Sequence, residues 1–136
     1  MKFGFVVLGQ IGAPMAMNLA KAYDVTIFDN KKEMMAAVAK KGTNALKRPE
    51  QFSKIDALIL CLPDANTVQH VLFDPKKGFT QYLKKGTIII DVSTTEYGVT
   101  LDINNNLGKI GIQFLDAPVS GMSTGGSDAS LSMMVG

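Results

Sequence analysis

The sequence predicts an α/β fold with a doubly wound parallel sheet, and three features predict it. Short apolar runs alternate along the chain with segments of helical pattern, as in strand–helix–strand units. Several runs are continuously apolar or rich in β-branched residues, which is typical of strands buried on both faces. Polar or glycine-containing residues follow these runs, where doubly wound sheets bind their ligands. With 136 residues, of which 46% are hydrophobic, the chain is long enough for one domain with its own core.

The first predicted unit is a strand, a glycine turn and a helix. Residues 3–8 form an apolar run, and residues 13–22 have a helical pattern. Between them, backbone N–H groups and the positive end of the helix dipole form an anion site, whose usual ligand is a dinucleotide pyrophosphate. Val7 stands where a complete G-x-G-x-x-G pattern has its first glycine, so the motif alone is a weak signal. The residues expected to hold the pyrophosphate are Gly9, Gln10, Ile11 and Gly12.

A second strand over residues 25–28 ends at Asp29, which lies 20 residues after Gly9. An acidic residue at this spacing commonly binds the ribose of a dinucleotide. The alternative is that Asp29 only caps the following helix, but the preceding strand favours the ribose role. A carboxylate accepts a ribose 2′-hydroxyl and repels a 2′-phosphate, so NAD is expected as the cofactor and NADP is less favoured. Lys31 and Lys32 argue mildly for NADP because either side chain could reach a phosphate.

The alternation continues through the middle of the chain. Residues 31–41 are good helix formers, and residues 43–46 form a weak third strand. A short helix begins at Pro49, since proline is well tolerated in a first helical turn. Residues 56–62 are the fourth and most apolar strand, which Pro63 ends.

The second half of the chain repeats the pattern. The elements expected there are a helix capped by Asp64, a helical turn at 79–83, a strand at 87–91, a helix at 96–107, and strands at 113–116 and 131–135. Residues 120–127 are expected to form a polar, glycine-rich loop. The glycine turn and the residues that follow the strands therefore converge at one edge of the sheet, which is more specific than any single motif.

Composition excludes several other functions. The 14 basic and 12 acidic residues give a net charge of +2, which does not indicate nucleic-acid binding. Cys61 is the only cysteine and His70 the only histidine, so neither an internal disulfide nor a zinc site is expected. No apolar run approaches the length of a transmembrane helix, and the glycine turn interrupts the N-terminal run that could imitate a signal peptide. A cytoplasmic protein without a membrane partner is expected.

Several segments match one known family, namely residues 4–12, 14–16, 18–19, 62–64, 91–94 and 114–121. The last segment, Phe-Leu-Asp-Ala-Pro-Val-Ser-Gly, is close to diagnostic. With these residues the chain resembles the cofactor domain of the β-hydroxyacid dehydrogenases, a group that includes 3-hydroxyisobutyrate dehydrogenase and, more distantly, 6-phosphogluconate dehydrogenase. The resemblance covers essentially the whole chain and implies a Rossmann-type domain that binds NAD(P).

The resemblance also implies roles for individual residues. It assigns the glycine turn to the pyrophosphate and Asp29 to the ribose of the adenosine. On the nicotinamide side it assigns Leu62, Pro63 and Thr94, and for the substrate carboxylate it assigns Ser120, Gly121 and, at the position of a second family glycine, Met122. Tyr23 and Tyr97 are further departures from the family pattern, because they stand where a glycine and a proline are usual.

The activity implied is oxidation of a small 3-hydroxy acid by an NAD-dependent oxidoreductase. Enzymes of this type carry their catalytic lysine on a separate helical domain, so no catalytic residue is expected in residues 1–136, which are interpreted as an NAD(P)-binding domain incomplete at its C-terminal end. The fragment alone is expected to be inactive and the full-length enzyme to be a homo-oligomer. The alternatives are a dinucleotide-binding or regulatory module without turnover, and an imine or glyoxylate reductase of the same fold.

Overall fold

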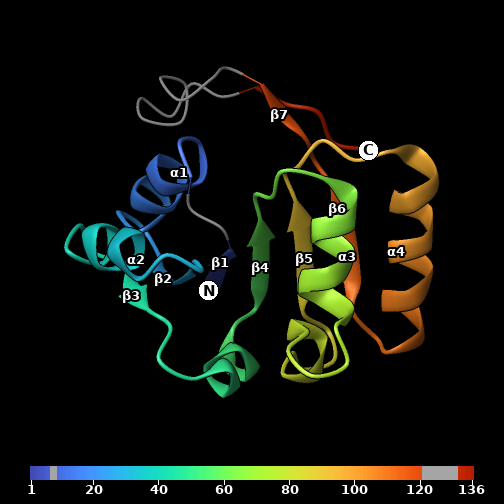
Figure 1. The fold of residues 1–136 in the computed structure, drawn as a ribbon, viewed down its shortest axis with the longest axis horizontal. Helices are drawn as coiled ribbons and strands as arrows, with labels where there is room; N and C mark the ends of the chain where they lie inside the picture. Colours follow the sequence, from blue (N-terminus) through green and yellow to red (C-terminus); the bar gives the residue numbers. More distant parts are fainter. Residues whose placement is uncertain (7–8, 121–131) are drawn as a thin grey trace.

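A computed structural model describes residues 1–6, 9–120 and 132–136. Its main sheet has six parallel strands in the spatial order β3-β2-β1-β4-β5-β6 (Figure 1). The strands are β1 (Lys2–Val6), β2 (Asp24–Phe28), β3 (Asn44–Ala45), β4 (Ala57–Leu60), β5 (Ile88–Asp91) and β6 (Gln113–Asp116). The strand order reverses between β1 and β4, which is the point where doubly wound sheets bind dinucleotides. The predicted fold class is confirmed.

Helices cover both faces of this sheet (Figure 1). They are α1 (Gly12–Leu19), α2 (Lys32–Ala39), α3 (Ala65–Phe73) and α4 (Tyr97–Lys109), with 3₁₀ helices η1 (Pro49–Lys54) and η2 (Phe79–Gln81). In β1, Phe5 packs into a core with α1 and α2, whereas the next residue, Val6, packs into a second core with α3 and α4. Successive strand residues point to opposite faces, so one strand supplies both cores. Both Phe5 and Val6 are fully buried.

The observed elements are shorter than the predicted ones at several ends. The helix predicted over residues 13–22 ends at Leu19, and the one over 31–41 ends at Ala39. The last predicted strand is reduced to β8 (Ser132–Met133), which pairs antiparallel with β7 (Val119–Ser120) in a separate sheet. Most of the predicted glycine-rich loop at 120–127 lies outside the described residues.

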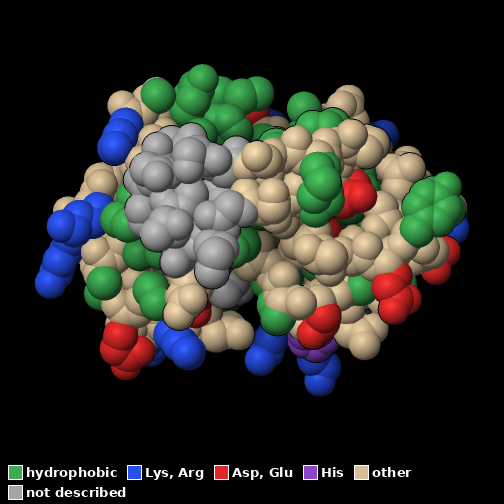
Figure 2. Space-filling view, turned by 90° about the horizontal axis from the view of Figure 1, so that it is seen from above, with side chains coloured by type: hydrophobic (Ala, Val, Ile, Leu, Met, Phe, Trp, Pro, Cys, Tyr) green, Lys and Arg blue, Asp and Glu red, His purple; other side chains and the backbone are tan. Residues whose placement is uncertain are grey.

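The carboxyl ends of the central strands lie at one edge of the sheet. There Leu60 of β4 pairs in register with Asp91 of β5, and Asp91 pairs with Asp116 of β6. Figure 2 looks onto the molecule from this side, with Lys and Arg side chains at the outline of the visible face. Within the described ranges, no helix combines the length and apolarity needed to cross a membrane.

Candidate functional site

The glycine turn lies at the start of α1. Gly9 has φ +40°, in the left-handed region that favours glycine, and a Cβ built on it would meet nothing within 4 Å. Its backbone conformation, rather than crowding, therefore favours glycine here. The N–H groups of Ala13 and Met15 donate to the carbonyls of Gly9 and Ile11, at 3.3 and 3.2 Å, which starts the helix directly from the turn.

Among the described residues, no side chain caps the N-terminus of α1. Its N-cap residue, Ile11, makes no side-chain capping hydrogen bond, and the first turn contains no acidic residue. Backbone N–H groups at such an end, together with the helix dipole, favour an anion. The turn therefore has the features of a phosphate site, with Gly9, Gln10, Ile11 and Gly12 together as predicted. Val7 lies outside the described residues.

Asp29 follows β2 and is 6% exposed. Its Oδ1 accepts a hydrogen bond of 2.8 Å from the N–H of Lys31, the N-cap residue of α2. This is an Asx turn, so the carboxylate supports the start of α2, as the alternative to ribose binding proposed. The two roles are compatible, because an ionised carboxylate has two oxygens and several lone pairs. Ribose binding by Asp29 stays a prediction.

The loops after β4 and β5 meet through buried hydrogen bonds. The Leu62 N–H donates to Ser93 Oγ at 2.8 Å, and the Ser93 N–H donates to Asp91 Oδ1 at 2.9 Å. Thr94 and Pro63, at the exposed ends of these loops, are solvent-accessible. A cavity of about 300 Å³ runs between the loops, with Thr94 in its lining. The structure thus brings the loop of Leu62 next to the loop of Thr94, although Leu62 and Pro63 do not line this cavity, and the nicotinamide role of all three residues stays a prediction.

The predicted substrate residues are only partly described. Ser120 is exposed in β7, where it pairs with Ser132 of β8. Gly121 and Met122 lie outside the described residues, so their predicted role stays a prediction.

A cluster of two carboxyl groups and a thiol, of which Asp91 is buried and Asp116 and Cys61 are half-buried, was not predicted as part of the site. Asp91 is fully buried, and burial, reinforced by the charge of Asp116, raises its pKa, while the hydroxyl and N–H of Ser93 oppose that rise. Burial also raises the pKa of Asp116. Burial and the charge of Asp91 raise the pKa of the Cys61 thiol to about 11. The sequence did contain a signal for this cluster, because the predicted strands 87–91 and 113–116 each end in an acidic residue, Asp91 and Asp116.

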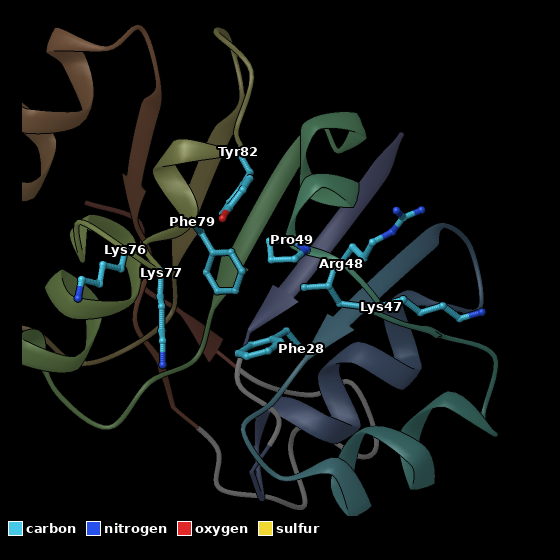
Figure 3. Close-up of a pocket in the computed structure, with 9 residues that line it drawn as sticks. Phe28, Lys47, Arg48, Pro49, Lys76, Lys77, Phe79 and Tyr82 are labelled. Carbon is cyan, nitrogen blue, oxygen red and sulfur yellow. The ribbon is translucent and has the colours of Figure 1, made fainter.

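A second cavity, of about 240 Å³, was also missed. Its walls include the rings of Phe28, Phe79 and Tyr82, and the rings of Phe28 and Phe79 meet edge to face at 5.3 Å (Figure 3). Figure 3 shows the charged ends of Lys47 and Arg48 directed away from these rings. None of the predicted site residues lines this cavity, although Phe28 is the last residue of β2 and directly precedes Asp29.

Comparison with known proteins identifies the domain. The model of the family described as the NAD binding domain of 6-phosphogluconate dehydrogenase matches residues 2–136. The curated relatives include 2-(hydroxymethyl)glutarate dehydrogenase of Eubacterium barkeri, 36% identical, and 2-hydroxy-3-oxopropionate reductase of Escherichia coli, 34% identical. Mitochondrial 3-hydroxyisobutyrate dehydrogenase of the mouse is 32% identical. These alignments cover 99%, 100% and 98% of this chain but only 45%, 47% and 40% of the respective relatives.

Solved structures agree with the sequence relatives. The 3-hydroxyisobutyrate dehydrogenase of Mycobacterium tuberculosis, solved with L-serine, superposes with a TM-score of 0.90 at 29% identity. The match covers 99% of this chain and 46% of that protein. An oxidoreductase of Mycobacterium avium superposes with a TM-score of 0.89 at 27% identity, over 98% of this chain and 47% of that protein. The chain therefore spans about half the length of the proteins it matches.

Proposed function

This chain belongs to the family of NAD-binding domains of 6-phosphogluconate dehydrogenase, as found in 3-hydroxyisobutyrate dehydrogenase-like enzymes, and we propose that it holds its dinucleotide along the carboxyl edge of the main sheet. The observation that carries this proposal is the glycine turn at the strand-order reversal. There a positive-φ glycine opens directly into the N-terminus of α1, with nothing within 4 Å of the space that a Cβ would occupy. That space admits a pyrophosphate close to backbone N–H groups.

The order of the loops supports a specific orientation of the dinucleotide. Across the sheet, β2, β1, β4 and β5 are successive neighbours. Their carboxyl ends carry, in the same order, Asp29, the glycine turn, Leu62 with Pro63, and Thr94. The parts of NAD follow one another in that order as adenosine ribose, pyrophosphate and nicotinamide nucleoside. The ligand would therefore lie across the strand ends with its adenosine half over β2.

The cofactor we propose is NAD rather than NADP. Asp29 is buried next to the proposed ribose position, and a carboxylate there accepts the 2′-hydroxyl and repels a 2′-phosphate. The backbone N–H of Lys31 also holds this carboxylate at the start of α2, whereas the side chains of Lys31 and Lys32 are the competing argument for NADP.

For the whole protein we propose dehydrogenation of a small hydroxy acid, in line with the names of its relatives. Bound nicotinamide would accept the hydride from the hydroxyl-bearing carbon. Ser120, Gly121 and Met122 are proposed to lie near the substrate carboxylate. No residue of this chain is proposed as the general base, which the family supplies as a lysine on another domain.

The test is calorimetric titration with NAD and NADP of the natural sequence, Gly9→Ala and Gly42→Ala. Gly9→Ala projects a methyl group into the proposed phosphate space and is expected to lower NAD affinity at least tenfold, about 1.4 kcal/mol. Gly42 is the matched control, since it has φ +102° and likewise nothing within 4 Å of a built Cβ. Gly42→Ala should lower stability through backbone strain and leave NAD affinity unchanged. Equal affinities in all three proteins, or no binding by the natural sequence, would contradict the proposal.

A further inference from the structure

Where the chain leaves the sheet after β4, the buried N–H of Leu62 needs a hydrogen-bond acceptor outside the sheet. The Val92 N–H still donates to the Leu60 carbonyl at 2.9 Å, and the Cys61 N–H still donates to the Val6 carbonyl at 2.7 Å. The next amide, of Leu62, is bonded to a side chain, Ser93 Oγ, at 2.8 Å. Leu62 is buried, so this N–H would lose its hydrogen bond with no exposure to water if the hydroxyl were removed.

The backbone of Ser93 is in turn held by the side chain of Asp91. Its N–H donates to Asp91 Oδ1 at 2.9 Å, and its side chain is 3% exposed. Asp91 is fully buried, and its Oδ2 has no hydrogen-bond donor among the described residues. A buried carboxyl with one unsatisfied oxygen is unfavourable for folding. A carboxyl at this position is explained if the hydrogen bond between Asp91 Oδ1 and the Ser93 N–H has a function, because an apolar residue could not accept that bond.

We infer that Asp91 and Ser93 are positioning residues that hold the Leu62–Pro63 segment in place for the nicotinamide half of the dinucleotide. Neither residue touches the ligand in this arrangement. Asp91 orients Ser93, Ser93 holds the Leu62 amide, and the segment after Leu62 forms the wall opposite Thr94. The inference rests on the proposed function, because it concerns one half of that proposed site.

Binding at the adenosine half of the proposed site serves as an internal control for changes to Ser93. Asp29 and the glycine turn belong to β2 and to the β1–α1 connection, and neither makes a hydrogen bond with Asp91 or Ser93 among the bonds described. Loss of the Ser93 hydroxyl should therefore affect ligands that reach the nicotinamide side and spare ligands that do not. ADP-ribose contains the adenosine, the pyrophosphate and the second ribose, and lacks only the nicotinamide ring.

The experiment measures the affinities of NAD and ADP-ribose by calorimetry for the natural sequence, Ser93→Ala, Asp91→Ala and Asp91→Asn. We expect the natural sequence to bind NAD more tightly than ADP-ribose. Ser93→Ala should lower NAD affinity about tenfold and change ADP-ribose affinity less than twofold. Asp91→Ala removes the acceptor of the Ser93 N–H and should lower NAD affinity as selectively as Ser93→Ala does, whereas the conservative Asp91→Asn keeps an Oδ1 acceptor and should rescue NAD affinity to within about twofold of the natural sequence. Equal effects of Asp91→Ala and Asp91→Asn on NAD affinity would overturn the role of Asp91.

Thr87→Val is the matched control for lost buried hydrogen bonds. Thr87 is fully buried just before β5, at the opposite end of that strand, where its Oγ1 donates to the Lys84 carbonyl at 2.7 Å. Valine has nearly the same shape, so Thr87→Val should lower the melting temperature and leave both affinities unchanged. A second measurement needs no variant: NAD should slow hydrogen exchange of the Leu62 amide more than ADP-ribose does.

The outcomes separate the inference from the proposed function. If the natural sequence binds neither ligand, the proposed function fails and the inference fails with it. If it binds NAD and ADP-ribose equally, dinucleotide binding stands and the inference is overturned. The inference is also overturned if Ser93→Ala weakens both ligands equally or neither of them, or if both ligands protect the Leu62 amide to the same extent.

Discussion

The two halves of the carboxyl edge are built differently. On the β1–β2 side, the glycine turn and Asp29 are shaped by neighbours in the chain, since Asp29 bonds Lys31 and Gly9 bonds Ala13. On the β4–β5 side, the loops are joined by a hydrogen bond between residues 31 positions apart, Leu62 and Ser93. Each part of the first half therefore has a hydrogen bond within its own segment, whereas the two loops of the second half are bonded to each other.

This difference has a consequence for how each half responds to mutation. A change in the first half alters the ligand contacts directly and leaves the rest of the fold intact. A change in the β4–β5 network acts through buried polar groups, Asp91 and Ser93, so it couples ligand binding to stability and to pH.

Gly4→Ala should destabilise the sheet beneath both halves of the carboxyl edge, because β1 lies between β2 and β4. A Cβ at Gly4 would lie 2.8 Å from Ile55 Cδ1, 2.9 Å from Leu58 Cδ1 and 3.0 Å from Phe52 Cε1. Overpacking of this kind should lower the free energy of unfolding by about 1–3 kcal/mol. Gly98→Ala in α4 is the control, since nothing lies within 4 Å of its built Cβ, and it should be neutral or stabilising. Urea denaturation of both variants measures the effect, and equal stabilities would show that the core accommodates the methyl group.

Asp29→Asn should affect only the adenosine half. The amide keeps an oxygen that can accept the Lys31 N–H, so α2 should still begin normally. Loss of the charge should weaken binding of NAD and strengthen that of NADP, and change their affinity ratio by about tenfold in favour of NADP. Titration of both cofactors and of nicotinamide mononucleotide checks this. An unchanged ratio would mean that Asp29 supports α2 and does not contact the ribose.

The sequence was sufficient to predict the fold and the places of the glycine turn and Asp29 at the carboxyl ends of β1 and β2, whereas the ligand contacts of these residues stay predictions. Alternating apolar runs located all six strands of the main sheet, and the spacing from Gly9 to Asp29 located both parts of the β1–β2 side. It did not predict the Leu62–Ser93 bond, because nothing in either segment specifies a partner in the other. It also missed the antiparallel pairing of β8 with β7, since periodicity predicts a strand and not its partner.

Asp91→Asn should make stability less dependent on pH. The folded-state pKa of Asp91 is raised above the unfolded value, so folding binds a proton, and stability falls as pH rises above about 4, the usual pKa of an aspartate. Asparagine does not ionise, so the variant should not lose stability in this way as pH rises. The variant should therefore gain stability relative to the natural sequence at pH 7, and the difference should shrink as pH is lowered toward 4. Asp116, Cys61 and Ser93 face the same carboxyl and are unchanged in this comparison. A difference that is constant from pH 4 to pH 8 would contradict a raised pKa.

Cys61 should be nearly inert in the folded protein. Burial and the nearby Asp91 raise the pKa of its thiol to about 11, so very little thiolate is present at pH 8. Alkylation by iodoacetamide at pH 8 should be much slower in the native state than in urea. A native rate equal to the unfolded one would show that the β4–β5 side is open to solvent, and it would weaken the contrast between the halves.

The most direct test of the account is a crystal structure of the protein with NAD. We predict pyrophosphate oxygens within hydrogen-bond distance of the N–H groups of the glycine turn. The same structure should have the adenosine ribose on Asp29 and the nicotinamide between Pro63 and Thr94. Binding in the reverse direction, or with the base or nicotinamide in the cavity lined by Phe28 and Phe79, would contradict the order of contacts proposed along the sheet.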